Sequence, residues 1–365
     1  MDLRDKRVLI TGANGFIGER LAERLAQEEG ARVRGLVRTR VGVRHLPDQD
    51  SPEIKIGIDQ PTNLGERGWA NASPQQTVIG DITDADAVRR AVDGCDIVVH
   101  CAAKQGHGKL DDFRRVNVDG TLNLLRAAQA ANVARFIHIS TINVHGYPPP
   151  RDANADSPLV FTGDYYSISK AEGERAARQF ARDNNLPLTV IRPACTYGPR
   201  SDAWTMQPLR RVRRGAPVLI AKGDGICNAV YIDNLIDLIL LVLKNDAAVG
   251  QAFIGAEGRG VTWREFYETY ARMVGMDHVN SLPRWMMFTA ATGFETIARV
   301  TGRAPFLSRA SVEFYSHRVV YDISKAQKIL GYAPRVSFEE GMRKTEDWLV
   351  EIGREEEIES VNRRT

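Results

Sequence analysis

The sequence predicts an α/β fold, in which a doubly wound parallel Rossmann sheet is followed by a smaller C-terminal α+β substrate domain. In the first half of the chain, short runs of β-branched residues alternate with segments of helical periodicity, as in a parallel sheet with right-handed crossovers. A glycine-rich turn separates the first strand from the first helix. After residue 193 the segments become shorter and less regular, which predicts a change of domain.

The expected strands are short and apolar, as suits strands that are buried on both faces. They lie at 7–12, 31–38, 76–83, 96–103, 135–141 and 187–193. Helical patterns separate several of them, at 16–29, 112–131 and 165–184. Residues 39–75 are polar, rich in Pro, Gly and Asp and without a clear period, so they predict a loop inserted at the surface.

The remainder of the chain predicts a domain that covers the substrate. Helical segments are expected at 204–214, 261–275 and 283–300, a strand and a helix at 228–245, and a strand, a helix and a Gly-Tyr-x-Pro stop at 319–335. We place the Rossmann domain at 1–193, with 229–254 returning to it, and the substrate-binding domain at 194–365.

The composition is that of an ordinary globular protein, with 43% hydrophobic and 26% charged residues. A net charge of +3 gives no case for nucleic-acid binding. The four cysteines form no C-x-x-C pair and the histidines lack metal-ligand spacing, so we expect no metal, no disulfide framework and a reducing, cytoplasmic location. The N-terminus leads straight into a strand, which argues against a signal peptide, and no apolar run approaches the ~18 residues of a spanning helix.

The turn in "LITGANGFIGERLAERL" places Gly12, Gly15 and Gly18 between the first strand and the first helix. The first glycine permits the tight turn, the second lets the backbone approach a pyrophosphate, and the third allows close helix–strand packing. The helix N-terminus supplies free N–H groups, so this context predicts dinucleotide binding rather than a purely structural turn. The other residues of the turn assigned to the cofactor are Asn14, Phe16 and Ile17.

The second strand ends in "LVRTR", twenty residues after Gly18. An acidic residue there would bind the ribose diol of NAD(H), whereas an arginine suits the 2′-phosphate of NADP(H). Arg38 therefore favours NADP(H), with Arg40 as a second contact and NAD(H) as the alternative. Both side chains could instead be exposed loop residues in an arginine-rich protein.

The stretch "YYSISK" places Tyr166 and Lys170 on one face of a predicted helix, whereas Tyr165 shares a face with Ser169. A lysine ammonium one turn away favours the phenolate and lowers the tyrosine pKa. Reaching neutrality from a pKa near 10 takes about three units, or roughly 4 kcal/mol, so a cationic cofactor would have to assist the lysine. Y-x-x-x-K alone is too short to assign a function.

Further motifs accompany these two. They are D-I at 81–82, "CAA" at 101–103, "VNVDGTLNLL" at 116–125, Ser-Thr at 140–141 and "RPACTYGP" at 192–199. With T-G-x-x-G-x-x-G and Y-x-x-x-K, they make the chain, from residue 5 to about 350, resemble the extended short-chain dehydrogenase/reductase family, within the NAD-dependent epimerase/dehydratase superfamily.

The resemblance implies a role for each matching residue. Tyr166 would be the proton-transferring acid/base, and Lys170 would hold the nicotinamide ribose and lower the tyrosine pKa. Thr141 would hydrogen-bond the reacting oxygen, with Ser140 beside it, while Asn117 would support the site through a neighbouring helix. Further cofactor contacts would be Asp81, Ile82, Ala102, Ala103 and Pro193. A hydride would move between the nicotinamide and a carbon that bears an alcohol or a ketone.

Departures from the sugar-nucleotide branches of the family bear on the substrate. Dehydratases carry an Asp–Glu pair, and decarboxylases a glutamate, in the segment where this chain has Ile142 and Asn143. Epimerases usually hold the diphosphate with an asparagine where Cys195 stands, and "GDGICNAVYIDN" lacks their later arginine. These segments resemble the 3β-hydroxysteroid dehydrogenase-like branch, which acts on hydroxyl and keto groups of apolar molecules. We therefore expect an NAD(P)-dependent oxidoreductase that interconverts a secondary alcohol and a ketone.

Two alternative functions remain. One is a nucleotide-sugar epimerase with a retained NAD(P), and the other is a non-catalytic Rossmann binding protein, although the intact Tyr–Lys pair disfavours this second alternative.

"RRVRR" at 210–214 predicts a solvated helix face, with contact to an anionic substrate as the alternative. The apolar helix at 284–300 predicts core packing, with a lipophilic pocket or peripheral membrane contact as alternatives. The expected partner is a small-molecule substrate, and we expect a homodimer.

Overall fold

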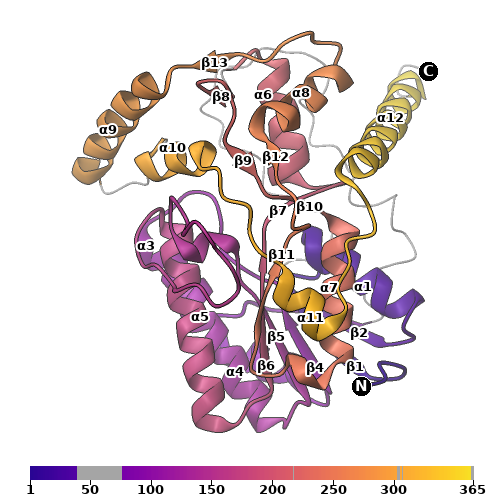
Figure 1. Ribbon diagram of the computed structural model, residues 1–365. Helices are drawn as coiled ribbons and strands as arrows, with labels where there is room; N and C mark the ends of the chain where they lie inside the picture. Colours follow the sequence, from indigo (N-terminus) through magenta and orange to yellow (C-terminus); the bar gives the residue numbers. More distant parts are fainter. Residues whose placement is uncertain (39–75, 217, 302–304, 306, 363–365) are drawn as a thin grey trace.

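The computed structural model describes residues 1–38, 76–216, 218–301, 305 and 307–362, so the predicted loop 39–75, with Arg40, lies outside the described residues. Seven parallel strands form one sheet in the order β11-β6-β5-β4-β1-β2-β3, which confirms the predicted α/β fold (Figure 1). The strands are β1 (Arg7–Thr11), β2 (Arg32–Val37), β3 (Gln76–Ile79), β4 (Ile97–His100), β5 (Arg135–Ile139), β6 (Leu188–Pro193) and β11 (Ala252–Gly255).

Helices cover both faces of this sheet (Figure 1). One face carries α1 (Phe16–Gln27), α7 (Ile232–Lys244) and α11 (Ser324–Leu330), and the other carries α2 (Ala85–Val92), α4 (Thr121–Ala130) and α5 (Tyr165–Asn184). Successive residues of β1 alternate between the two cores: Val8 and Ile10 pack on the side of α1 and α7, whereas Leu9 packs on the side of α2 and α4. Burial on both faces explains why the strands are continuous apolar runs.

Several strands end earlier than the sequence predicted. β3, β4 and β5 stop at Ile79, His100 and Ile139, and the residues up to 83, 103 and 141 have already left the sheet. The carboxyl ends of parallel strands meet at one edge, so these segments gather where α/β proteins bind ligands.

Two other elements also differ from the prediction. The helix expected at 112–131 is divided into α3 (Leu110–Arg114), the π-helical segment η1 (Arg115–Gly120) and α4. The strand expected at the start of 319–335 is absent: residues 317–323 lead into α11 without pairing with any strand. The predicted stop is present, since Gly331 ends α11 in the left-handed region with φ +66.

Past β6 the chain builds a smaller layer beyond the carboxyl edge of the sheet (Figure 1). Its strands form three pairs: β7 (Cys195–Tyr197) with β10 (Ala229–Tyr231), β9 (Ile226–Cys227) with β12 (Val261–Thr262), and β8 (Leu219–Ile220) with β13 (Ser281–Leu282). Its helical segments are η3 (Asp202–Met206), α6 (Gln207–Arg213), α8 (Trp263–Met273), α9 (Arg284–Thr301), α10 (Arg309–Ser316) and α12 (Phe338–Asn362). The short segments η2 (Ile142–His145) and η4 (Asp246–Ala248) follow β5 and α7.

Two helices of this layer test the predictions for 210–214 and 284–300. α6 buries Leu209 and Val212 and exposes its arginines, which confirms the solvated face. α9 projects from the layer (Figure 1) and meets the expectation of core packing on one face only: Ala291 is buried in a small cluster with Ile220 and Val312, whereas Trp285 and Val300 are 70% and 85% exposed. Among the described helices, none is long and apolar enough to cross a membrane.

Candidate active site

Each glycine of the turn between β1 and α1 meets a separate steric requirement. Gly12 has φ +68, and a Cβ there would lie 3.0 Å from backbone atoms of Ala102. A Cβ on Gly18 would lie 2.3 Å from the Gly12 carbonyl oxygen. Gly15 is the N-cap of α1 and places no side chain over the first-turn N–H groups. The turn is therefore a backbone cradle that side chains would fill and that an anion such as a pyrophosphate fits.

Tyr166 and Lys170 lie in the first two turns of α5, at the carboxyl edge of the sheet. The Tyr166 hydroxyl is hydrogen-bonded to the side chains of Thr141, just past β5, and Gln105, in the loop after β4. The Lys170 ammonium donates to the carbonyl of Ile139, the last residue of β5, at 2.7 Å. The end of β5 thus holds both side chains of the predicted Tyr–Lys pair.

Burial shifts the pKa of both members of this pair in the cofactor-free protein. Burial raises the pKa of Tyr166 to about 12, with the Asp164 carboxylate acting in the same direction and the hydrogen bond to Thr141 acting against it. Burial also lowers the pKa of Lys170 to about 8, against the opposing charge of Glu174. In the cofactor-free protein burial outweighs the hydrogen bond to Thr141, so Tyr166 is a neutral phenol at pH 7.

The structure separates the two neighbouring hydroxyls after β5. Thr141 accepts a hydrogen bond from the Asn143 N–H at 3.3 Å and reaches Tyr166. The Ser140 hydroxyl instead donates to Glu174 Oε2 at 2.8 Å, and Ser140 is buried. Only Thr141 is therefore brought to the phenol, although the sequence placed both hydroxyls at the site.

Asn117 of η1 braces the loop after β4 against α5. Its Oδ1 accepts from the Lys104 N–H at 2.7 Å, and its Nδ2 donates to the Lys104 carbonyl at 3.1 Å and to Ser169 Oγ at 2.9 Å. The helix lies so close that a Cβ on Gly173 would be 2.3 Å from the Asn117 carbonyl oxygen. These contacts hold the loop after β4 against the helix that carries Tyr166 and Lys170.

His100 links β4 to its neighbours through both ring nitrogens. Nε2 lies 2.9 Å from the Thr121 hydroxyl, which itself donates to the Asn117 carbonyl at 2.8 Å, so Nε2 carries the proton. Nδ1 then accepts from Thr11 Oγ1 at 2.8 Å, and Thr11 Oγ1 accepts from the Ala102 N–H at 3.2 Å. Burial lowers the His100 pKa to about 3, so the ring stays neutral and has a structural function.

The remaining predicted cofactor residues lie at the same edge. Arg38 is exposed and directly follows β2. Asp81 follows β3, and its Oδ1 accepts from the N–H and the hydroxyl of Thr83 at 2.8 and 2.9 Å. Ile82 is buried beside it, Pro193 is the last residue of β6, and Ala102 and Ala103 follow β4.

Sequence reasoning did not single out Gln105, Glu174 or Arg192. Glu174 lies four residues after Lys170, a spacing that places it on the same helix face. Gln105 carried no signal, because its contact with Tyr166 depends on the path of the loop after β4. Within the described ranges, no group of three or more His, Cys, Asp or Glu side chains could hold a metal ion.

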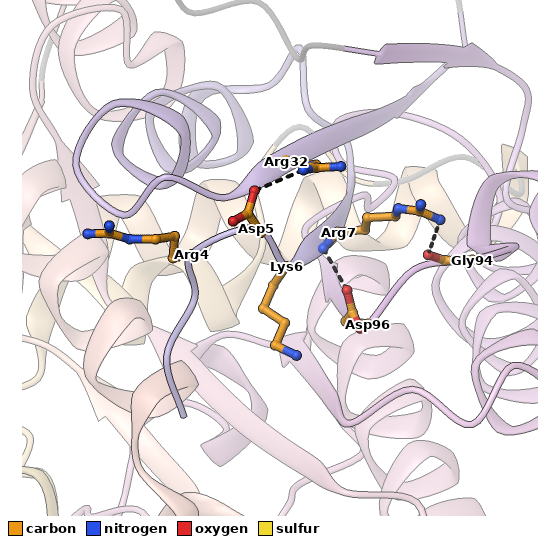
Figure 2. A pocket seen from close by; sticks show the side chains of 7 residues that line it. All are labelled: Arg4, Asp5, Lys6, Arg7, Arg32, Gly94 and Asp96. Atoms are coloured by element: carbon orange, nitrogen blue, oxygen red, sulfur yellow. Dashed lines mark hydrogen bonds and ion pairs between the residues drawn. The ribbon is translucent and has the colours of Figure 1, made fainter.

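A surface depression lies at the opposite edge of the sheet, at the amino ends of β1 and β2 (Figure 2). Its lining residues are Arg4, Asp5, Lys6, Arg7, Arg32, Gly94 and Asp96. Arg32 pairs with Asp5 at 2.9 Å, and the Arg7 guanidinium donates to the Gly94 carbonyl at 3.3 Å. None of the predicted site residues lines this depression.

A model of the NAD-dependent epimerase/dehydratase family matches residues 8–254. The chain is 28% identical to a UDP-glucose 4-epimerase of Vibrio cholerae, with 93% of this chain and 94% of that protein covered. It is 27% identical to a 2-alkyl-3-oxoalkanoate reductase of Stenotrophomonas maltophilia (93% and 98% covered) and 28% identical to a 3β-hydroxysteroid dehydrogenase/Δ5→4-isomerase of Mycobacterium tuberculosis (95% and 91% covered).

The structure is similar to that of a dTDP-glucose 4,6-dehydratase from Streptomyces venezuelae with NAD and TYD bound. The TM-score is 0.71 at 25% identity, and the match covers 94% of this chain and 97% of that chain. The parallel sheet, the glycine cradle and the family match over residues 8–254 lead to one assignment. This chain is an enzyme of the NAD-dependent epimerase/dehydratase family, of the extended short-chain dehydrogenase/reductase type.

Proposed function

We propose that the protein interconverts a secondary alcohol and a ketone with a nicotinamide cofactor, and that Tyr166 exchanges the proton on the reacting oxygen. One observation carries the proposal: hydrogen bonding joins the Tyr166 hydroxyl to Thr141, and the Lys170 ammonium donates to Ile139 at 2.7 Å, so both side chains lie at the end of β5, at the same carboxyl edge as the glycine cradle after β1. When bound, the cofactor would supply or accept the hydride, and its oxidised form would add a positive charge.

The protonation states favour a proton donor in the ligand-free protein. A phenol with a pKa of about 12 holds its proton at pH 7, so Tyr166 can donate it to the oxygen of a bound ketone as that oxygen becomes negative. Thr141 is within reach of the phenol and would donate a second hydrogen bond to the same oxygen. Lys170, with a pKa of about 8, stays largely protonated and would stabilise the phenolate that remains.

We further propose that the N–H groups after Gly15 hold the pyrophosphate of the cofactor and that Asp81 and Ile82 contact its adenine. Arg38 supports NADP(H) over NAD(H), because an exposed guanidinium at the end of β2 can pair with a 2′-phosphate. Ser140 is proposed to support Glu174 rather than to contact substrate. A homodimer and a cytoplasmic location stay predictions from the sequence, as does the division into two domains at residue 193.

The surroundings of Tyr166 support a lipophilic or lightly charged substrate. Cys195 is buried, so it offers no exposed donor to a diphosphate. The ring of Tyr147, in the loop after β5, lies 5.2 Å from that of Phe314 in α10, which brings aromatic surface towards the end of β5. The relatives include enzymes named for a 3-oxoalkanoate and for a steroid. A nucleotide-sugar epimerase is the second candidate, supported by the similarity to the UDP-glucose 4-epimerase.

We predict that Tyr166→Phe lowers turnover by about a hundredfold or more, because the proton path is lost. Cofactor affinity should change only a few-fold. The assay follows NADPH absorbance with a 2-alkyl-3-oxoalkanoate and, in the reverse direction, NADP+ reduction with a 3β-hydroxysteroid. Tyr165→Phe is the matched control and should be mild, since the Tyr165 ring packs edge-on against Phe113 at 6.3 Å. Near-normal turnover by Tyr166→Phe would refute the catalytic assignment.

We predict that Arg38→Ala raises the Kd for NADP+ by about tenfold or more and leaves the Kd for NAD+ almost unchanged. The reason is that only NADP+ carries the 2′-phosphate. Isothermal titration calorimetry measures both constants. Arg32→Ala, at the other end of the same strand, is the control and should alter neither value. Equal affinity of the unmodified protein for the two cofactors would sink the NADP(H) preference.

Sugar nucleotides should not stabilise the NADP-loaded protein at micromolar concentration, because a site without dedicated donors leaves the two diphosphate charges poorly compensated. Thermal-shift titration with UDP-glucose, dTDP-glucose and GDP-mannose tests this expectation. A saturable micromolar shift that Tyr166→Phe retains and that a nucleoside diphosphate competes away would promote the epimerase function instead.

A further inference from the structure

Glu174 continues the helix face that carries Tyr166 and Lys170, one turn beyond the lysine. Glu174 and its partner Arg192 on β6 are both fully buried. The Arg192 guanidinium donates to both carboxylate oxygens, at 3.0 Å from Nε and through Nη2. Ser140, just past β5, adds a third hydrogen bond at 2.8 Å. One carboxylate therefore joins α5 to two strands of the sheet.

Arg192, the partner of Glu174 on β6, makes further contacts with the loop after β5. Arg192 Nη1 donates to the Ala155 carbonyl at 2.8 Å and lies 3.2 Å from His145 Nε2. A guanidinium can only donate, so His145 Nε2 accepts and its Nδ1–H donates to the Pro158 carbonyl at 3.2 Å. Removing one partner of such a buried pair is strongly destabilising, because the other charge stays buried and uncompensated.

The titratable groups around Lys170 lie on or next to three elements, β4, β5 and α5. On β4 and just after it lie His100 and Cys101, and on β5 lies His138. Burial lowers the pKa of His100 to about 3 and that of His138 well below its usual value, and burial raises the pKa of Cys101 to about 12. All three groups are consequently neutral at pH 7.

The helix itself supplies the other two groups, Tyr166 and Glu174. Tyr166 is neutral, since burial raises its pKa to about 12. Burial also tends to raise the pKa of Glu174, but the hydrogen bonds and charge of Arg192 outweigh it and the pKa is lowered. Of the described groups that face Lys170, Glu174 is thus the one that is anionic at neutral pH.

We propose that Glu174 is a positioning residue of the active site, which Arg192 and Ser140 fix to the sheet so that its charge keeps the Lys170 ammonium protonated at neutral pH. This inference rests on the proposed function, in which that ammonium supports Tyr166 and the cofactor. The hydrogen bonds set the place of the helix turn, and the carboxylate supplies a negative charge on the same helix face, one turn from the lysine. A purely structural Glu174 would do only the first of these.

The test is a direct titration of Lys170 in the full-length, cofactor-free protein. Lysine labelled with ¹³C at Cε reports each ammonium by NMR, and Lys170→Arg assigns its signal. The unmodified protein should titrate with a midpoint at about pH 8. Glu174→Gln should lower the midpoint by about one unit or more, because the attractive charge is lost and Arg192 is left uncompensated.

A second variant guards against loss of folding. Glu174→Gln combined with Arg192→Gln leaves no buried unpaired charge, and its midpoint should lie between those of the single variant and the unmodified protein. Arg178→Gln is the matched control: Arg178 is the partly exposed second partner of Glu174 at 3.4 Å, and its loss should not lower the midpoint.

Two results overturn the proposal. One is a folded Glu174→Gln or double variant whose Lys170 midpoint equals that of the unmodified protein, which would leave Glu174 a structural function alone. The other is a midpoint below pH 7 in the unmodified protein, which needs no variant to observe. The titration uses neither cofactor nor substrate, so it stays separate from the turnover test of Tyr166.

Discussion

The close packing of α5 against the sheet is the constraint on which the site depends. The approach of Gly173 to the Asn117 carbonyl leaves no room for a side chain, and the buried Glu174–Arg192 pair joins the helix to β6. These contacts fix the helix turns that carry Tyr166 and Lys170 over the end of β5. Asn117 also holds the Lys104 backbone in the loop after β4, so the same packing organises the loop that brings Gln105 to the phenol.

This packing buries Tyr166 and Lys170 and so shifts the pKa of both side chains. Burial disfavours charge, so the phenol of Tyr166 becomes a weaker acid and the ammonium of Lys170 a stronger one. A neutral tyrosine is the state that a ketone reductase needs before hydride transfer. For the reverse reaction the phenolate must form, and the charges that favour it are the Lys170 ammonium and an oxidised nicotinamide.

The sequence predicted those parts of the site that local patterns encode. The glycine turn, the strand before it and the Tyr–Lys spacing are short-range features, and in the structure Tyr166, Lys170 and Thr141 all lie at the end of β5. Contacts between distant segments were not predictable. One example is the Ser140 hydroxyl, which donates a hydrogen bond to Glu174, 34 residues away. Burial also results from the whole fold, so the raised pKa of Tyr166 in the cofactor-free protein could not be predicted from the Tyr–Lys spacing.

Other differences also have physical causes. The helix pattern at 112–131 is continuous in sequence, yet the backbone is π-helical where Asn117 bonds to the loop and to α5. The apolar residues of 284–300 fit core packing equally well in sequence, but in the structure α9 projects from the layer and leaves Trp285 and Val300 exposed.

We propose that the glycine cradle and the end of β5 together hold one nicotinamide cofactor against Tyr166. A crystal structure of the protein grown with NADP+ tests this most directly. We expect the pyrophosphate on the N–H groups at the start of α1, the nicotinamide ribose hydroxyls on the Lys170 ammonium and the Tyr166 hydroxyl facing C4 of the nicotinamide ring. A nicotinamide ring directed away from Tyr166, or a ribose that makes no contact with Lys170, would contradict it.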